Sequence, residues 1–188
     1  VQIKEYEEPS RPDVVVYLDC ASHGEEGLTA VQLEDAMTSA AATIVNVWLG
    51  QTVATRLIAY PDQRQELEGQ RPSDFETFQD YLARVAFQGP YPLEDILKLE
   101  LDRAAGANSV VVVTASRSQA LFNTLLNLTT AGVALTCILV APEEDEAARL
   151  APDSAARMVQ EMVGQGMQAV LLHPGEGLAL AYERGMRP

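Results

Sequence analysis

The chain has 188 residues, enough for one domain with a sizeable core, and its 47% hydrophobic content excludes a disordered chain. A net charge of −14 argues against a nucleic-acid surface, which needs a basic patch. The only cysteines are Cys20 and Cys137, so neither a disulfide scaffold nor a zinc site is expected. The longest apolar stretch, Ala36–Trp48, is too short to span a membrane.

Residues 1–12 are polar and include Pro9 and Pro12, which predicts a lead-in segment or linker. Residues 13–188 are predicted to form one domain. Because the chain begins at Val1 without a methionine or a signal peptide, we expect a fragment of a longer protein.

The continuous apolar run Val14–Leu18 predicts a strand buried on both faces, with Asp19 at its end. Helical spacing follows from Thr29 to Gly50, where Thr29 and Gln32 are expected to form a capping box. Further strands are predicted at Thr52–Tyr60, Gln65–Glu68, Val110–Thr114, Val133–Val140 and Gln168–Leu172. The charged Gln65–Glu68 segment is typical of an antiparallel edge strand.

Helices are predicted between these strands. A capping box of Ser73 and Glu76 is expected to start one helix, and Asp153 or Ser154 to cap another. The remaining helices are predicted at Leu93–Ala105, Ser118–Thr130 and Glu176–Arg184. This alternation predicts an α/β fold with a doubly wound, mostly parallel six-stranded sheet.

Ligands of open α/β sheets bind outside the carboxyl ends of the strands, so the candidate site residues lie there. The loop Gly89–Pro92 is expected to arch over the same edge. The candidates for partner binding are Asp19, Ser22, His23, Gly89, Tyr91, Ser116 and Arg117. Mg²⁺ requires several oxygen ligands, and Asp19, Ser22 and Ser116 are the residues that would supply them.

The sequence gives less support to two other kinds of site, a hydrolase site and a nucleotide-binding site. Ser22, His23 and Asp19 suggest a small serine hydrolase, but adjacent residues seldom place a hydroxyl on the neighbouring imidazole, and no elbow glycines flank Ser22. No glycine pattern for binding phosphate is present, so nucleotide binding is unsupported. His173, before Pro174, is expected to be structural or exposed.

The order of elements, with Asp-x-x-Ser after the first strand, resembles a von Willebrand factor type A domain. The opening VQIKEYEE, followed by VVVYLDCAS, and Glu34 near the start of the first helix resemble the bacterial family called domain of unknown function 58. Members of that family are anchored in the membrane by an upstream hydrophobic hairpin and are often encoded beside MoxR-type AAA ATPases. The resemblance therefore implies protein assembly on the cytoplasmic side of the membrane, or a cytoplasmic protein if no anchor precedes the chain.

The resemblance also implies a metal-ion-dependent adhesion site with the pattern Asp-x-Ser-x-Ser. Asp19 matches it, but Ala21 and His23 replace the two serines, and Ala115 or Ser116 stands where an aspartate is expected. Residues 87–92 contain no counterpart of the family's threonine. We therefore expect a non-enzymatic protein-interaction domain with a degenerate metal site and no cofactor. The main alternative is a domain that still binds Mg²⁺, and the hydrolase is a distant one.

Two structural expectations follow from the resemblance. Its strand order, 3-2-1-4-5-6, puts a strand between Cys20 and Cys137, a gap of roughly 10 Å that predicts two free thiols. Asp19, without a metal, is expected to organise the loop 20–27, with Ser22, His23, Arg117 and backbone amides as its nearest partners.

Overall fold

A single six-stranded sheet forms the centre of the protein. The computed structural model describes residues 14–100, 106–149 and 151–185, so the predicted lead-in segment 1–12 lies outside the described residues. The strands are β1 (Val14–Leu18), β2 (Thr55–Ala59), β3 (Gln65–Gly69), β4 (Ser109–Thr114), β5 (Leu135–Val140) and β6 (Gln168–Leu172). Their order is β3-β2-β1-β4-β5-β6, and every pair is parallel except β2 with β3. This confirms the predicted fold class and the antiparallel edge strand.

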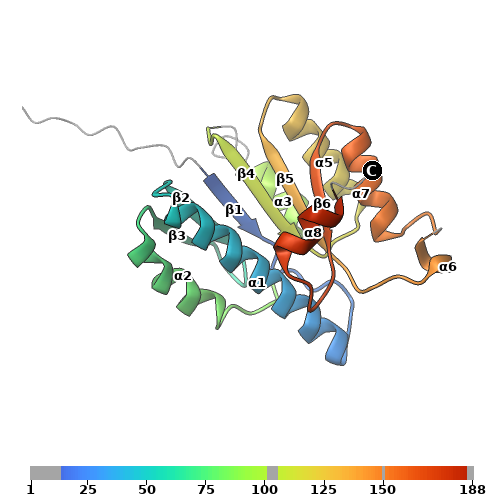
Figure 1. Ribbon diagram of the computed structural model, residues 1–188, viewed down its shortest axis with the longest axis horizontal. Helices are drawn as coiled ribbons and strands as arrows, with labels where there is room; N and C mark the ends of the chain where they lie inside the picture. The colour runs from blue at the N-terminus through green and yellow to red at the C-terminus, as the bar shows by residue number, and fades with distance from the viewer. Residues whose placement is uncertain (1–13, 101–105, 150, 186–188) are drawn as a thin grey trace, which may run out of the picture.

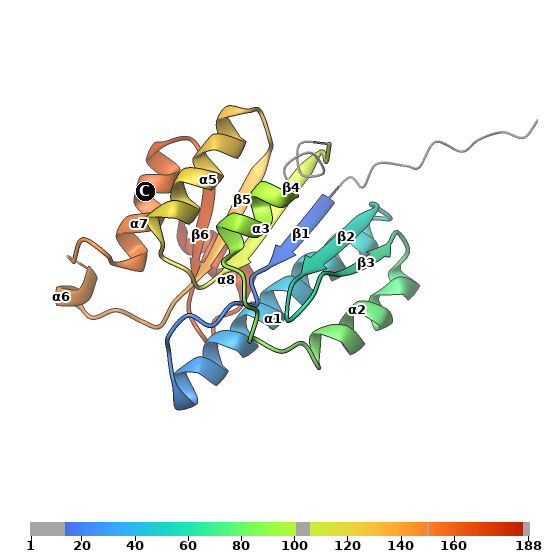
Figure 2. The same cartoon turned by 180° about the vertical axis from the view of Figure 1, so that it is seen from behind.

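Helices cover both faces of the sheet. They are α1 (Gly27–Gly50), α2 (Phe75–Leu82), α3 (Leu93–Leu99), α5 (Gln119–Thr130), α6 (Glu146–Arg149), α7 (Ala155–Gly164) and α8 (Leu178–Gly185). Figure 1 shows α1, α2 and α8 on the near face, and Figure 2 shows α3, α5 and α7 on the opposite face. Within the described residues, no helix is both long enough and apolar enough to cross a membrane.

The core forms because β1 is apolar at every position and has neighbours on both sides and both faces. Alternate side chains of β1 point to opposite faces, so Val16 packs under α1 and Tyr17 packs under α3 and α5. The α1 stripe that includes Met37, Ala41 and Val45 is fully buried against the near face. The sheet therefore separates two hydrophobic layers.

Both predicted capping boxes are wrong. Helix α1 begins two residues before Thr29, at Gly27, with Glu26 at the N-cap. The segment before α2 forms a short 3₁₀ helix, η1 (Pro72–Asp74), instead of a cap at Ser73. There the Asp74 carboxylate accepts hydrogen bonds from the backbone N–H groups of Gln70 and Arg71, both at 2.9 Å, and so satisfies the donors that a Ser73 cap would not reach.

The two cysteines lie in different layers. Cys20 belongs to the core under α1, whereas Cys137 belongs to the core on the opposite face. Strand β4 separates β1 from β5, as predicted. Both thiols are free and buried, which confirms the prediction, and burial raises the pKa of each thiol to about 12.

Gly89 fastens the loop between α2 and α3 to the end of β1. Its N–H donates to the carbonyl of Cys20 at 2.8 Å, and it pairs with Ala21 in an isolated parallel bridge. A Cβ atom at this position would lie 2.4 Å from the Tyr60 carbonyl oxygen and 3.1 Å from that of Cys20. The two backbones approach too closely for any side chain.

Gly89→Ala is therefore expected to destabilise the protein by about 1–3 kcal/mol, because two backbone segments must move apart to admit one methyl group. Urea melts measure this change. Gly177→Ala is the matched control, since a Cβ at Gly177 meets no atom within 4 Å. Equal midpoints for wild type and Gly89→Ala would contradict the close packing.

Candidate functional site

The loops that follow β1, β4 and β5 enclose a cavity at the carboxyl edge of the sheet. Its volume is about 440 Å³. Four predicted site residues line it together: Ser22, His23, Ser116 and Arg117. Gly89 and Tyr91 belong to the α2–α3 loop at the same edge but do not line this cavity. Parallel strands bring these loops together, since their carboxyl ends share one edge.

Asp19 lies beneath the loops and is fully buried. Its Oδ2 atom accepts a hydrogen bond of 2.6 Å from the Thr114 hydroxyl, and its Oδ1 atom accepts one of 3.1 Å from the N–H of Ala21. His23 Nε2 lies 3.4 Å from Oδ2, within ion-pair distance, but forms no hydrogen bond. We call these four residues, Asp19, Ala21, His23 and Thr114, the Asp19 cluster.

Burial raises the pKa of Asp19 above its usual range, because desolvation disfavours the carboxylate. The charge of His23 and the two hydrogen bonds act in the opposite direction, and Glu94 adds a smaller upward contribution. The carboxylate thus depends on its donors, since a buried charge without partners is very costly.

Thr114 was not predicted as a site residue. In the β1–β4 register Leu18 pairs with Val113, so the residues that follow, Asp19 and Thr114, lie side by side. The hydroxyl of Thr114 also accepts a hydrogen bond from the N–H of Ser116 at 2.9 Å, which links the ends of the two strands to the β4–α5 loop. The sequence did contain a signal for Thr114, because this polar residue ends an otherwise apolar run of valines.

Arg117 does not contact Asp19, contrary to the expectation. Its Nη1 atom lies 3.4 Å from the Asp153 carbonyl and 3.8 Å from Glu144 Oε1. Glu144 in turn accepts a hydrogen bond of 2.7 Å from the N–H of Ala155 at the start of α7. Arg117 therefore links the β4–α5 loop to the start of α7 and is not part of the Asp19 cluster.

Glu94 is a second buried carboxylate near this edge, and the sequence did not reveal it. Its Oε1 atom accepts a hydrogen bond of 3.0 Å from the Ser118 hydroxyl, which also accepts the N–H of Leu121 at 3.0 Å and caps α5. Glu94 Oε2 has no hydrogen-bond partner in the described part of the chain. An acidic residue in the first turn of a helix is common, because it interacts favourably with the helix dipole. Nothing in the sequence therefore indicated that Glu94 is buried.

The residues at this edge do not fit the oxygen-rich metal site implied by the resemblance. Ala21 and Ala115 have no side-chain oxygen, and the two oxygens of Asp19 are bound by Thr114 and Ala21. His23 stands next to the carboxylate where a cation would have to approach. Among the described residues, no group of three or more His, Cys, Asp or Glu side chains could hold a metal ion.

The arrangement also offers little to nucleophilic chemistry. His23 Nε2 is directed at Asp19, and Ser22 is exposed at the mouth of the cavity. Burial and the charge of Asp19 keep the Cys20 thiol protonated. His173 was expected to be structural or exposed; its side chain is buried, and its Nδ1 atom lies 2.9 Å from the Ala141 carbonyl oxygen.

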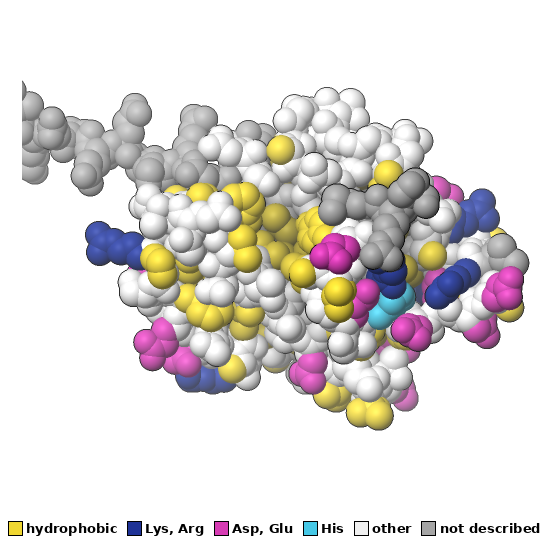
Figure 3. Space-filling view, viewed as in Figure 1, with side chains coloured by type: hydrophobic (Ala, Val, Ile, Leu, Met, Phe, Trp, Pro, Cys, Tyr) yellow, Lys and Arg dark blue, Asp and Glu magenta, His cyan; other side chains and the backbone are white. Residues whose placement is uncertain are grey.

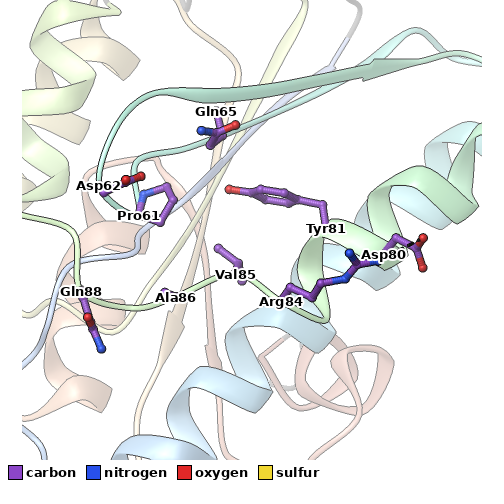
Figure 4. A pocket seen from close by; sticks show the side chains of 9 residues that line it. All are labelled: Pro61, Asp62, Gln65, Asp80, Tyr81, Arg84, Val85, Ala86 and Gln88. Carbon is purple, nitrogen blue, oxygen red and sulfur yellow. Dashed lines mark ion pairs between the residues drawn. The ribbon is translucent and has the colours of Figure 1, made fainter.

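A larger cavity of about 640 Å³ lies beside the turn between β2 and β3. Figure 4 shows the Tyr81 ring directed from α2 toward Pro61 and Asp62 in that turn, with Val85 below it. The Tyr81 hydroxyl is buried and has no hydrogen-bond partner among the described residues, and Arg84 pairs with Asp80 at 3.4 Å. None of the predicted site residues lines this cavity.

The sequence matches no family model and no curated protein. Solved structures with a similar fold include the following two. The conserved hypothetical protein BatB from Bacteroides thetaiotaomicron has a TM-score of 0.51 and 11% identity, over 91% of this chain and 94% of that chain. The SpRpn10 VWA domain has a TM-score of 0.50 and 11% identity, over 93% of this chain and 94% of that chain. Such low identity shows the fold alone, and together with the strand order it gives this chain a von Willebrand factor A-like fold.

Proposed function

We propose that this domain is a non-enzymatic protein-binding module whose carboxyl edge contacts its partner without a metal ion. The observation that carries the proposal is the Asp19 cluster. Thr114 and Ala21 bind the carboxylate that would hold a cation, and His23 stands beside it. Asp19 then has a structural role, because it holds the loop after β1 in place.

Exposed apolar side chains at the same edge support protein binding. Helix α1 has 24 residues, about 36 Å at 1.5 Å per residue, whereas the five residues of β1 span only about 16 Å. The first turns of α1 therefore extend beyond the sheet (Figure 1). They carry Leu28 and Val31, which are 72% and 51% exposed, and Tyr91 on the neighbouring loop is 52% exposed. Figure 3 shows hydrophobic side chains at this lower end of the view.

Exposed apolar side chains at one end of a domain are typical of a protein-binding surface. The resemblance to the domain of unknown function 58 family supports a MoxR-type AAA ATPase as the partner. It also supports a location on the cytoplasmic side of the membrane. Binding to the host's ATPase tests the partner, and fractionation of host cells tests the location.

The first prediction from this proposal concerns metal binding. Titration of the protein with Mg²⁺ or Mn²⁺ in a calorimeter is expected to give no 1:1 binding heat at sub-millimolar metal, because too few oxygens face any one point. A clear 1:1 heat that disappears in Asp19→Ala would instead support the alternative, an adhesion domain that retains its metal.

A second prediction concerns the role of Asp19. Asp19→Asn keeps the shape and removes a buried charge, so it is expected to cost less than about 1 kcal/mol. Asp19→Ala leaves the Thr114 hydroxyl and the Ala21 N–H without an acceptor and is expected to cost about 1–3 kcal/mol. Urea melts compare the two, with Asp35→Asn as a control for loss of an exposed charge. If Asp19→Asn is as damaging as Asp19→Ala, the charge itself matters and the structural role is wrong.

A third prediction concerns the partner. The immobilised protein is expected to bind the MoxR-type ATPase of its host, and Leu28→Asp or Tyr91→Asp should weaken that binding at least about tenfold. Val47→Asp is the matched control, since Val47 is 49% exposed near the other end of α1. Equal losses from all three variants would argue against this edge as the binding surface, and no binding at all would exclude this partner.

A further inference from the structure

The two edges of the sheet differ sharply in charge. The β3 edge carries Glu66 and Glu68, and Arg56 on β2 pairs with both, at 2.8 and 2.7 Å. Charged side chains on an edge strand discourage pairing with another strand. The β6 edge has the sequence QAVLL, without a charge. Of the two edges, β6 is the one suited to accept a further strand.

The N–H and C=O groups of successive residues in a strand point to alternate sides. This alternation identifies the residues of β6 whose backbone groups face away from β5. The carbonyl of Leu172 accepts the N–H of Ala141 beside β5, so Leu172 faces the sheet. Neighbouring residues of a strand direct their N–H and C=O groups to opposite sides, so Leu171 and Ala169 face outward. Neither of their N–H groups has an acceptor in the described part of the chain.

One outward carbonyl is already occupied. Arg184 on α8 donates a hydrogen bond from Nη2 to the Leu171 carbonyl at 2.5 Å, and the same atom lies 3.0 Å from Glu176 Oε2. A carbonyl oxygen has two lone pairs, so this contact leaves room for a second donor. In the free protein, Arg184 therefore bonds the outward carbonyl of Leu171, and a further strand can still pair with this edge.

A groove of about 540 Å³ lies along this edge between α7 and α8. Its walls combine polar and apolar side chains, and the apolar ones include Val159 and Val163 of α7 and Ala181 of α8. Val163 is 55% exposed, although it lies on the same helix as the buried Met162. Alternate side chains of an added strand would have apolar surface to contact here.

The groove also has a free positive charge at its end. Arg149 lines the groove, and its guanidinium makes no ion pair with any described residue. Glu144, the nearest lining acid in the sequence, is held by the N–H of Ala155 and by Arg117. A carboxylate on the incoming strand would complement Arg149.

We propose that the β6 edge binds an extended segment of a partner protein, which adds a seventh strand to the sheet. The segment pairs with the backbone of Ala169 and Leu171, has apolar residues at alternate positions, and carries an Asp or Glu that reaches Arg149. This site lies along β6, beside the carboxyl edge, and the proposal does not depend on the function proposed for that edge. A second copy of this chain is disfavoured as the occupant, because each copy would bring its own Arg149 and a net charge of −14.

Amide hydrogen exchange tests the free edge. The N–H groups of Ala169 and Leu171 are expected to exchange at least about a hundredfold faster than those of Val170 and Leu172, which face β5. Equal protection of all four amides would mean that the edge is already covered, and would overturn the proposal.

Selection from a phage-displayed library of random peptides, with the whole chain as bait, tests the occupant. Enriched peptides are expected to alternate apolar residues and to carry an acidic residue near one end, and to protect the amides of Ala169 and Leu171 from exchange. Ala169→Pro removes one N–H donor and should weaken binding about tenfold, as should Arg149→Ala.

A matched control keeps the test specific. Arg157→Ala removes an arginine of α7 that pairs with Glu161 and does not line the groove. This variant should change binding by less than about twofold. The proposal fails if no peptide is enriched, if the peptides do not protect the two amides of the wild type, or if sedimentation shows that the edge pairs with a second copy instead. Amide protection in the wild type decides the matter even if Ala169→Pro does not fold.

Discussion

The hydrogen bond from the Thr114 hydroxyl to the Asp19 carboxylate joins the ends of the two central strands. It lies where the chain turns out of the sheet on both β1 and β4, so the loops on either side begin from one fixed point. The bond is buried, and its acceptor is a carboxylate, which makes it stronger than a hydrogen bond between neutral groups. The positions of His23, Ala21 and Ser116 follow from it, since each contacts one of its two partners.

This bond also compensates the charge of a carboxylate that is buried at the end of a strand. A carboxylate buried at a strand end needs compensation from a cation or from donors. Here the donors are the Thr114 hydroxyl and the Ala21 N–H, and the His23 imidazole lies 3.4 Å from the carboxylate. Asp19 is thus stabilised by groups of its own chain.

Much of the fold could be predicted from the sequence, because continuous apolar runs such as Val14–Leu18 and the charged edge strand at Gln65–Gly69 have few other solutions. Helix starts were less predictable. Glu26 and Asp74 stand at the N-caps instead of Thr29 and Ser73, since the donors to be satisfied depend on how the chain enters the helix. At the site, Asp19 and His23 were found from their place after a strand. Thr114 required the strand register, and Glu94 required tertiary packing that no local pattern encodes.

The placement of the two cysteines on opposite sides of the sheet has a practical consequence. Cys20 is covered by the layer that contains α1, and Cys137 by the layer that contains α5 and α7. An alkylating reagent reaches each thiol only when its own layer opens, because both thiols are buried and protonated. The chain therefore carries a natural reporter for each half of its core, and the two labelling rates reveal whether the layers open together or one at a time.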